Sequence, residues 1–521
     1  MSPTNPRPAS PTERFAHWPD VLLCLMAICL GVCRAFFHAR HADIGFDDES
    51  GYLAAGLQFF HVGPPTGENS PLYALWYWAE STVFADPVTL YQANWGVIAT
   101  ATLLVQLLAL RSAGLGTLGT GLALILISIA HYFDVWPHVT ALSGVLVLSA
   151  AIAGLRTNSR PMAYSAMATV FAIAVFVRPE LLLSFVLILG VAALCCARER
   201  ALAPILLPVV AFAALAFAFG VPFGGGRSMV AFGQHYALNV VQARHLQIDS
   251  WNHWTEFVEA DFGSAATPLQ AMVANPRAFA WHVGTNATNI PRNLYLLAPS
   301  FPAIGVKAQV AAGAILAVVL GIGVYRAIRR IRSDERGRRL LVVAVCLLVP
   351  YLISALLVAP RPHYFMAPLA ALCLLGCHGL AGMGSLRARW LLAAGPLPFL
   401  FIGLTWAREA PSVPNLATIR VLEGLPLPGS GVILEPDFGR AVYARLNYRS
   451  LSYGTCSPFS NCLRSDKPAV IVSDARLRSN YAGDDGFAAF ARRPSDFGFD
   501  IAPVRGTDIL VYFVRRPLNT P

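Results

Sequence analysis

Asp47, Asp48 and Glu49 form a run of three consecutive acids within the segment Phe46–Tyr52. Crowded carboxylates repel one another, and this raises the pKa of at least one member of a cluster unless a cation or water attends to it. A carboxylate with a raised pKa suits a general base that takes a proton from an attacking hydroxyl group. The alternative is a solvated acidic loop in which Asp48 caps a helix that starts near Ser50.

Further acids and bases lie where long apolar blocks end: Asp134, Arg178 with Glu180, and Arg361 with His363. The planar guanidinium of arginine matches phosphate oxygens, so Arg361, His363 and Arg178 are candidates for binding a phosphate group. The alternative for each is an interfacial anchor, because Arg and His near helix ends reach toward lipid head groups. Asp134 could ligate a divalent cation with the acid triplet, or it could cap the next helix.

The elements that must position these side chains are membrane-spanning helices. The chain has 521 residues, of which 56% are hydrophobic and only 13% are charged. Its apolar residues come in blocks of about 17–25, which are long enough to cross about 30 Å of hydrocarbon as helices. Such blocks exclude a soluble enzyme. They also exclude an outer-membrane barrel, because the strands of a barrel alternate apolar and polar residues.

The formal net charge of +10 is distributed as membrane topology requires. Basic residues fall between every second pair of apolar blocks, as expected of cytoplasmic loops, so we expect no nucleic-acid partner. The pattern predicts eleven spans, with the N-terminus inside. They are Val21–Phe37, Asn94–Leu110, Leu118–Ala130, Val139–Leu155, Met162–Val177, Leu181–Cys196, Leu202–Phe223, Ala303–Tyr325, Leu340–Val358, Phe365–Leu380 and Trp390–Trp406.

The same pattern divides the chain into three parts. We expect a cytoplasmic tail at residues 1–20, a membrane domain at 21–406 and a periplasmic or equivalent extracytoplasmic α/β domain at 407–521. Two long external loops are expected at about 38–92 and at about 224–300. The predicted fold is therefore an all-α polytopic membrane protein with a small α/β domain outside the membrane.

Local patterns predict the elements of these external parts. In the first loop, GYLAAGLQFF and PLYALWYWAE have helical spacing without spanning length, which predicts helices that lie at the interface. In the last domain, the β-branched runs VILEP, AVIVSD and ILVYFV predict strands. Cys456 and Cys462 lie in a polar segment of that domain and would form a disulfide in an oxidising compartment.

The external motifs resemble a known family. The pattern Asp48-Glu49-x-x-Tyr52, followed by Pro71-Leu72-Tyr73 in the same loop, resembles the GT-C superfold of polyprenyl-phosphate-sugar glycosyltransferases. Similar enzymes by pattern are the bacterial aminoarabinose transferases that act on lipid A and the protein O-mannosyltransferases. Arg178-Pro179-Glu180 is similar to the Arg-Pro that closes a short helical hairpin in these enzymes. Arg361-Pro362-His363-Tyr364 is similar to their segment that meets the donor phosphate.

The resemblance implies an inverting glycosyltransferase that moves a sugar from a polyprenyl-phosphate donor to a glycan or glycolipid acceptor at the periplasmic face of the inner membrane. Asp47 is an extra acid relative to the family pattern, so Asp47 and Asp48 are both candidate bases. A divalent cation (Mg2+, Mn2+ or Ca2+) is a candidate cofactor. The implied roles are catalysis for Asp48, Asp47 and Glu49, donor-phosphate binding for Arg361, His363, Tyr364 and Arg178, substrate binding for Tyr52, Tyr73 and Glu180, and metal binding for Asp134 with Asp48.

Two other classes share the hydropathy pattern. A flippase or transporter of lipid-linked saccharides would place costly polar groups near the middle of its spans, whereas here the acids and bases gather at the outer ends. A membrane scaffold whose last domain binds a glycan or a partner protein is a weaker alternative. The position of the charged residues favours the enzyme.

Overall fold

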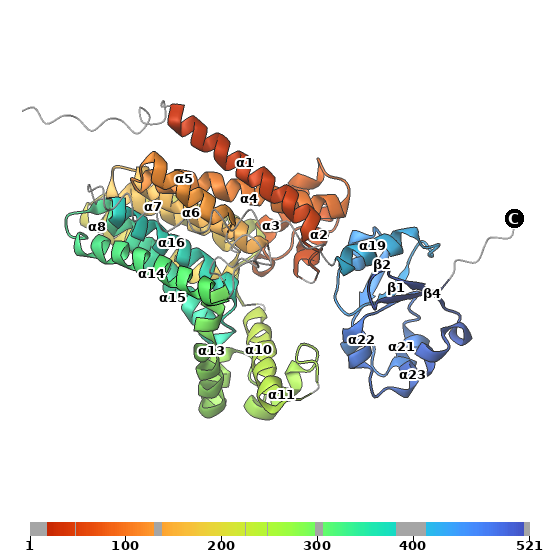
Figure 1. Cartoon of the computed structure of the whole chain (residues 1–521). Helices are drawn as coiled ribbons and strands as arrows, with labels where there is room; N and C mark the ends of the chain where they lie inside the picture. The colour runs from red at the N-terminus through yellow and green to blue at the C-terminus, as the bar shows by residue number, and fades with distance from the viewer. Residues whose placement is uncertain are drawn as a thin grey trace, which may run out of the picture.

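The computed structural model of the chain describes residues 18–46, 48–129, 138–224, 226–246, 248–296, 306–381 and 413–514. These residues are mostly helical, and a small α/β domain follows the helices near the C-terminus (Figure 1).

The long apolar helices pack side by side in a bundle. They are α1 (Trp18–His41), α4 (Pro87–Ser112), α5 (Thr117–Ile129), α6 (Val139–Arg156), α7 (Arg160–Val175), α8 (Leu182–Arg198), α9 (Leu206–Phe219), α14 (Val306–Arg329), α15 (Glu335–Leu357) and α16 (Pro362–Ala381). A helix therefore occupies the place of each of the first ten predicted spans. The predicted span Trp390–Trp406 lies outside the described residues.

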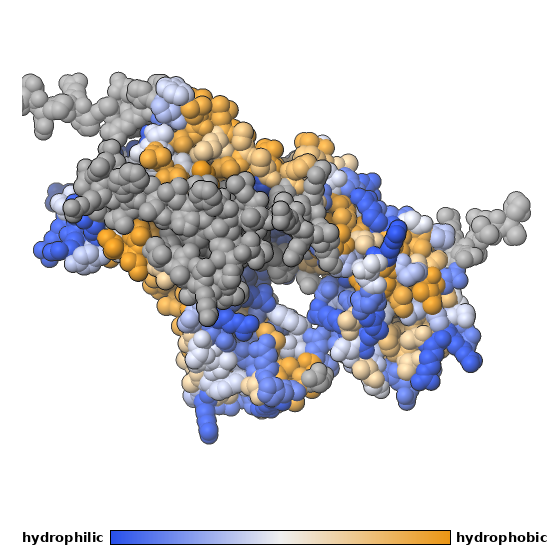
Figure 2. All heavy atoms as spheres, viewed as in Figure 1, coloured by the Kyte–Doolittle hydropathy of each residue, from blue (hydrophilic) through white to orange (hydrophobic). Residues whose placement is uncertain are grey.

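Within the described part of the chain, six helical segments are long and apolar enough to cross a membrane. They are Trp18–Phe36, Pro87–Ser112, Val139–Arg156, Pro179–Arg198, Glu335–Leu357 and Pro362–Ala381. The chain is thus a multi-pass membrane protein, although the predicted number of eleven spans is not confirmed. Apolar side chains of α1 such as Leu25, Val32 and Phe36 are more than half exposed, as expected of a lipid-facing helix. Figure 2 shows a hydrophobic surface along this part of the bundle.

Two groups of shorter helices lie in the predicted external loops. The first consists of α2 (Asp48–Leu57), the single-turn 3-10 helix η2 (Gly67–Asn69) and α3 (Pro71–Ser81), and its α-helices cover the two segments predicted to be helical there. The second consists of α10 (Arg227–Arg244), α11 (Trp254–Phe262), α12 (Pro268–Ala274) and α13 (Pro276–Leu296). In Figure 1 this second group projects away from the bundle. Its surface in Figure 2 is largely hydrophilic.

The C-terminal domain is a five-stranded sheet in the order β2-β1-β3-β5-β4. Its strands are β1 (Gly431–Leu434), β2 (Tyr448–Leu451), β3 (Val470–Ser473), β4 (Asp500–Pro503) and β5 (Leu510–Phe513), and its helices are α19 (Pro414–Gly424), α20 (Arg440–Tyr443), α21 (Phe459–Ser465), α22 (Ala475–Asn480) and α23 (Asp485–Arg492). β2, β1 and β3 are parallel, while β5 pairs antiparallel with β3 and β4. The three predicted β-branched runs form β1, β3 and β5. The edge strands β2 and β4 escaped prediction because partly exposed edges need no continuous apolar run.

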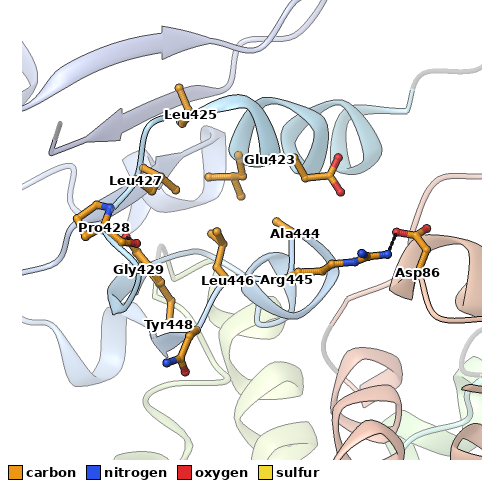
Figure 3. A pocket seen from close by; sticks show the side chains of 12 residues that line it. Asp86, Glu423, Leu425, Leu427, Pro428, Gly429, Ala444, Arg445, Leu446 and Tyr448 are labelled. Atoms are coloured by element: carbon orange, nitrogen blue, oxygen red, sulfur yellow. Dashed lines mark hydrogen bonds and ion pairs between the residues drawn. The ribbon is translucent and has the colours of Figure 1, made fainter. Parts of the chain in front are cut away.

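The C-terminal domain also contacts the start of α4. There Arg445 donates a 2.7 Å hydrogen bond to Asp86, which itself caps α4 through the backbone N–H of Thr89. A surface cavity of about 410 Å³ lies beside this ion pair, between α19 and β2 (Figure 3). Its lining residues are those of the domain junction and do not include the predicted site residues.

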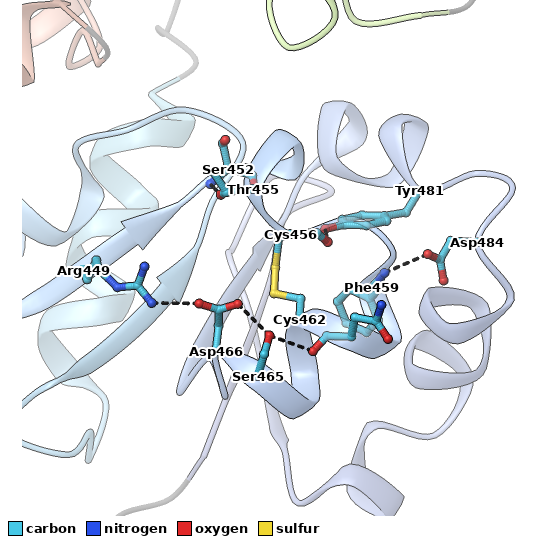
Figure 4. The surroundings of a disulfide bond; sticks show 11 residues. Arg449, Ser452, Thr455, Cys456, Phe459, Cys462, Ser465, Asp466, Tyr481 and Asp484 are labelled. Carbon is cyan, nitrogen blue, oxygen red and sulfur yellow. Dashed lines mark hydrogen bonds and ion pairs between the residues drawn. A yellow bond between two sulfur atoms is a disulfide. The ribbon is translucent and has the colours of Figure 1, made fainter.

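Cys456 and Cys462 are joined by a disulfide at the edge of a small aromatic core (Figure 4). Tyr481 closes over this loop and donates a 2.6 Å hydrogen bond to the carbonyl of Cys456. The side chains of Phe459 and Phe487 pack against the ring of Tyr481. The disulfide thus fixes the loop between β2 and α21.

Candidate active site

Glu49 lies at the centre of a buried pocket in the first external loop. Its Oε1 accepts hydrogen bonds from the phenols of Tyr73 (2.6 Å) and Tyr77 (2.5 Å). Its Oε2 accepts a 3.0 Å hydrogen bond from the backbone N–H of His138, just before α6. Asn94 of α4 adds a 2.8 Å bond to the Tyr73 hydroxyl. The carboxylate therefore ties α2, α3, α4 and α6 together.

The electrostatics of this pocket are set by burial. The side chain of Glu49 has no exposed surface, and desolvation raises its pKa to about 7. The hydrogen bonds from Tyr73, Tyr77 and the His138 backbone act in the opposite direction because they favour the charged form. Both oxygens already have donors, so Glu49 is better suited to holding the pocket than to meeting a substrate.

Asp48 occupies a different environment, although it is the preceding residue. It is exposed in the first turn of α2, where a carboxylate interacts favourably with the helix dipole. Asp47, the other predicted base, lies outside the described residues. Among the described acids of the triplet, Asp48 is thus the one that a substrate can reach.

The local fold brings α2 and α3 unusually close. Gly56 of α2 meets the backbone of Ala74 and the Cβ of Tyr77, so a side chain at this position would collide with α3. Pro71 occupies the first turn of α3, where its missing N–H costs nothing. Tyr73 and Tyr77 are four residues apart on this helix and therefore point in the same direction, toward Glu49.

A second cluster contains the predicted phosphate-binding residues. Arg178 precedes the short 3-10 helix η4 (Pro179–Leu181), is nearly fully buried, and lies 3.4 Å from Oε1 of Glu180. Burial alone would lower the pKa of its guanidinium, but Glu180 and the hydroxyls of Tyr52, Tyr351 and Tyr364 outweigh burial and raise it. Arg178 is therefore a fixed cation in a polar pocket.

Arg227, at the start of α10, joins this cluster from the second external loop. One of its guanidinium nitrogens donates to the carbonyl of Glu68. Burial would lower its pKa, whereas a hydrogen bond with Tyr52 and the charge of Glu180 raise it. Arg178 also lies within electrostatic reach of Arg227. The sequence prediction missed Arg227. It comes directly after three glycines at the start of the loop, a position that could have marked it as a charged residue at the membrane boundary.

Arg361 lies in the segment that joins α15 to α16, and His363 lies in the first turn of α16. The guanidinium of Arg361 lies over the ring of Trp251, 5.4 Å from its centroid. His363 is buried next to Tyr364 and within electrostatic reach of both Arg178 and Arg361. The structure thus brings together arginines from three distant segments.

Tyr52 connects the two clusters. Its hydroxyl accepts a hydrogen bond from Arg227, and its ring packs edge-to-face on Tyr73, with 5.2 Å between the ring centroids. Tyr52 also follows Asp48 by one helical turn of α2, and residues at this spacing are surface neighbours. The exposed carboxylate of Asp48 is therefore one helical turn from a tyrosine that also lies within reach of the buried Arg178 and the half-buried Arg227.

The described residues do not form a metal centre. Within the ranges given above, no group of three or more His, Cys, Asp or Glu side chains could hold a metal ion. Asp134, the predicted ligand, lies outside those ranges, and the oxygens of Glu49 are taken by hydrogen-bond donors.

Comparisons with known proteins find similarity only among solved structures. No family model and no curated protein matches the chain. The archaeal oligosaccharyltransferase AglB from Archaeoglobus fulgidus, in complex with an inhibitory peptide and a dolichol-phosphate, aligns with 97% of this chain and 75% of its own, at 11% identity and a TM-score of 0.45. ArnT from Cupriavidus metallidurans aligns with 94% of this chain and 97% of its own, at 12% identity and a TM-score of 0.39 in the apo state. The same coverage is found at 13% identity and a TM-score of 0.37 for ArnT bound to undecaprenyl phosphate.

Scores this low carry no argument about activity, so the function is argued from the site itself.

Proposed function

We propose that the chain is an inverting glycosyltransferase that moves a sugar from a polyprenyl-phosphate donor to a hydroxyl group of a glycan or glycolipid, at the periplasmic face of the inner membrane. The observation that carries the proposal is that Arg178, Arg227 and Arg361 all lie within electrostatic reach of Tyr364. Two of them, Arg178 and Arg227, also lie within reach of Tyr52, one turn from the exposed Asp48. A cluster of guanidinium groups at a membrane boundary suits a lipid-linked phosphate.

The reaction follows from the presence of an exposed carboxylate, Asp48, and of a nearby cluster of guanidinium groups. Asp48 takes the proton of the acceptor hydroxyl while that oxygen forms a bond to the anomeric carbon of the sugar. The bond between the anomeric carbon and the phosphate oxygen breaks, and its electron pair stays on the departing lipid phosphate. The arginines stabilise the negative charge that develops there, because they are already in place before the bond breaks. Tyr52 belongs to the same helix as Asp48 and bonds Arg227, so it holds the base and the phosphate-binding arginines at a fixed separation.

The orientation of the site is supported by the C-terminal domain. The Cys456–Cys462 disulfide is expected to persist only in an oxidising compartment such as the periplasm. The domain contacts the acidic segment through Ser50 and Asp43, so both belong on the same side of the membrane. A donor carried by a membrane lipid suits a compartment that receives no nucleotide sugars.

The test is sugar transfer by purified protein in lipid vesicles, supplied with radiolabelled polyprenyl-phosphate sugars and an extract of envelope glycans and glycolipids. Asp48→Asn is expected to lower transfer by about 100-fold or more, since it removes the base. Asp485→Asn, which changes an exposed acid of α23, is the matched control and should transfer like the wild type.

Asp47→Asn is measured in parallel because Asp47 is the second candidate base. Transfer that survives both Asp47→Asn and Asp48→Asn would contradict the assignment of the acid triplet. Movement of intact lipid-linked sugar to the opposite leaflet, with no transfer, would replace the proposal by a flippase.

A further inference from the structure

The acidic segment, residues 43–50, is held by the C-terminal domain at its beginning. The carboxylate of Asp43 accepts hydrogen bonds from the backbone N–H groups of Asn415 (2.8 Å) and Leu416 (2.9 Å), at the start of α19. The side chain of Asn415 returns a 2.8 Å hydrogen bond to the carbonyl of Ile44. These bonds satisfy N–H groups that have no partner within the helix. Asp43 of the acidic segment therefore caps the N-terminus of α19.

The end of the acidic segment is held by a second part of the domain, residues 438–443. The hydroxyl of Ser50 donates a 2.8 Å hydrogen bond to the carbonyl of Phe438. The hydroxyl of Tyr443 donates a 3.1 Å bond to the carbonyl of Gly45. The guanidinium of Arg440 lies over the ring of Phe46, 4.5 Å from its centroid. Ser50 is two residues from Asp48, in the same turn of α2.

Residues 438–443 are themselves fixed within the domain. Arg440 and Glu435 are both almost fully buried and lie 3.6 Å apart. Glu435 also accepts hydrogen bonds from the backbone N–H groups of Gly439 and Arg440 and from the hydroxyl of Ser450. A buried pair that is also hydrogen-bonded on its free oxygens defines one geometry. The contact with the acidic segment is therefore made by a rigid part of the domain.

Gly439 makes this contact very close. Its φ of +135° is a conformation that side chains rarely adopt, and a Cβ built there would lie 2.6 Å from Oγ of Ser50. The backbone of the domain thus touches the first turn of α2 directly, next to the exposed Asp48.

We infer that the C-terminal domain positions the base of the transfer site: residues 438–443 hold the first turn of α2 so that Asp48 faces the acceptor. Gly439 and Tyr443 are then positioning residues, which act through α2 and do not touch the substrate. The inference rests on the proposed function, since it takes Asp48 as the base. Donor binding should depend little on this contact, because, among the described residues, 438–443 contact Ser50, Gly45 and Phe46 and not the phosphate-binding arginines.

The experiment uses the full-length protein in vesicles and compares Gly439→Ala with Gly429→Ala. Gly429 has open space around its Cβ direction, so its variant is a matched control in the same domain. Hydrogen–deuterium exchange of residues 43–57 reports the position of the segment, and transfer kinetics report its consequence. Ser50→Gly removes the two nearest atoms that the new Cβ would meet and leaves Cδ1 of Phe46 at 3.1 Å, so the double variant Gly439→Ala with Ser50→Gly tests partial rescue.

We expect Gly439→Ala to accelerate exchange in residues 43–50 and to lower the turnover number by about tenfold, with the donor KM changed by less than about twofold. The control should match the wild type, and the double variant should recover part of the loss relative to Ser50→Gly alone, because the φ of +135° still strains an alanine at position 439 in the double variant. Unchanged exchange in residues 43–50, or accelerated exchange with an unchanged turnover number, would overturn the inference.

Two further readouts keep the outcome interpretable. Exchange in β3 and β5 shows whether Gly439→Ala unfolds the whole domain. If it does, Tyr443→Phe, which removes only the hydrogen bond to Gly45, takes its place and is expected to show the same pattern more weakly. A wild type that transfers no sugar overturns the proposed function, and the exchange data then decide alone whether the domain holds the acidic segment.

Discussion

Asp48 and Glu49 are neighbours in the first turn of α2, yet Asp48 is exposed while Glu49 is completely buried. A helix turns by about 100° per residue, so adjacent side chains point to different surroundings. Glu49 points toward α3, where Tyr73 and Tyr77 donate to it. The two acids therefore have separate roles, one toward the substrate and one toward the fold.

Replacing each acid by alanine should separate these roles. Glu49→Ala leaves the phenols of Tyr73 and Tyr77 buried without their acceptor, and we expect it to destabilise the protein by about 2–3 kcal/mol. Asp48→Ala removes an exposed side chain and should change stability by less than about 0.5 kcal/mol while abolishing transfer. Thermal unfolding of the purified variants in detergent checks the first effect, and the vesicle assay checks the second. Equal stability of the two variants would show that the Glu49 pocket does not support the fold.

The burial of Glu49 also predicts a dependence of stability on pH. Its pKa is about 7 in the folded chain and 4.5 in the reference state. Between these values the folded state binds a proton that the unfolded state has released. The stabilising contribution is therefore fully present below pH 4.5 and is lost as the pH rises through 7. The limiting slope is about 1.4 kcal/mol per pH unit.

This dependence should disappear when Glu49 cannot titrate. We expect the melting temperature of the wild type to fall between about pH 5 and about pH 7.5, and that of Glu49→Gln to fall less. Glu259→Gln, at an exposed position of α11, is the control and should follow the wild type. Parallel curves for Glu49→Gln and the wild type would assign the pH dependence to other groups.

The sequence predicted secondary structure correctly where the pattern of residues within one segment determines it. The helical spacing in GYLAAGLQFF and PLYALWYWAE predicted α2 and α3, and the β-branched runs predicted the strands β1, β3 and β5. The burial of Glu49 could not be predicted, because it depends on α3 and on the backbone of His138, which are distant in sequence. The glycines before Arg227 mark the start of the second loop, but its partner Tyr52 could not be predicted because it belongs to the other external loop.

Arg227 should contribute mainly to donor binding. Arg227→Ala removes one guanidinium from the cluster beside Tyr52, and we expect the KM for the lipid-linked donor to rise by about tenfold or more. Arg227→Lys should recover only part of this loss, because an ammonium group lacks the planar fork. Arg244→Ala, at the exposed end of the same helix, is the control. A donor KM that is the same for Arg227→Ala and Arg244→Ala would remove Arg227 from the phosphate site.

The last carbonyl groups of α15 are held by two buried polar residues of α13, His282 and Asn286, and Asn239 of α10 bonds both of them. Asn286 donates to the carbonyls of Leu356 (2.9 Å) and Val358 (3.2 Å), and Nε2 of His282 lies 3.1 Å from the carbonyl of Leu357. A carbonyl can only accept, so Nε2 of His282 carries the hydrogen and Nδ1 accepts the 2.9 Å bond from Asn239. Burial lowers the pKa of His282 to about 4, which keeps the ring in this neutral form.

This arrangement fixes the chain just before Arg361. Asn286→Leu leaves two half-buried carbonyls without this donor, and we expect a loss of about 1–2 kcal/mol in stability. Because Arg361 follows Val358 by three residues, the donor KM should also rise, while the turnover number at saturating donor stays close to that of the wild type. Asn293→Leu makes the same change on the same helix at a residue that bonds the carbonyl of Asn289 within α13, so it controls for the substitution itself. Loss of stability with an unchanged donor KM would show that these residues cap α15 without positioning Arg361.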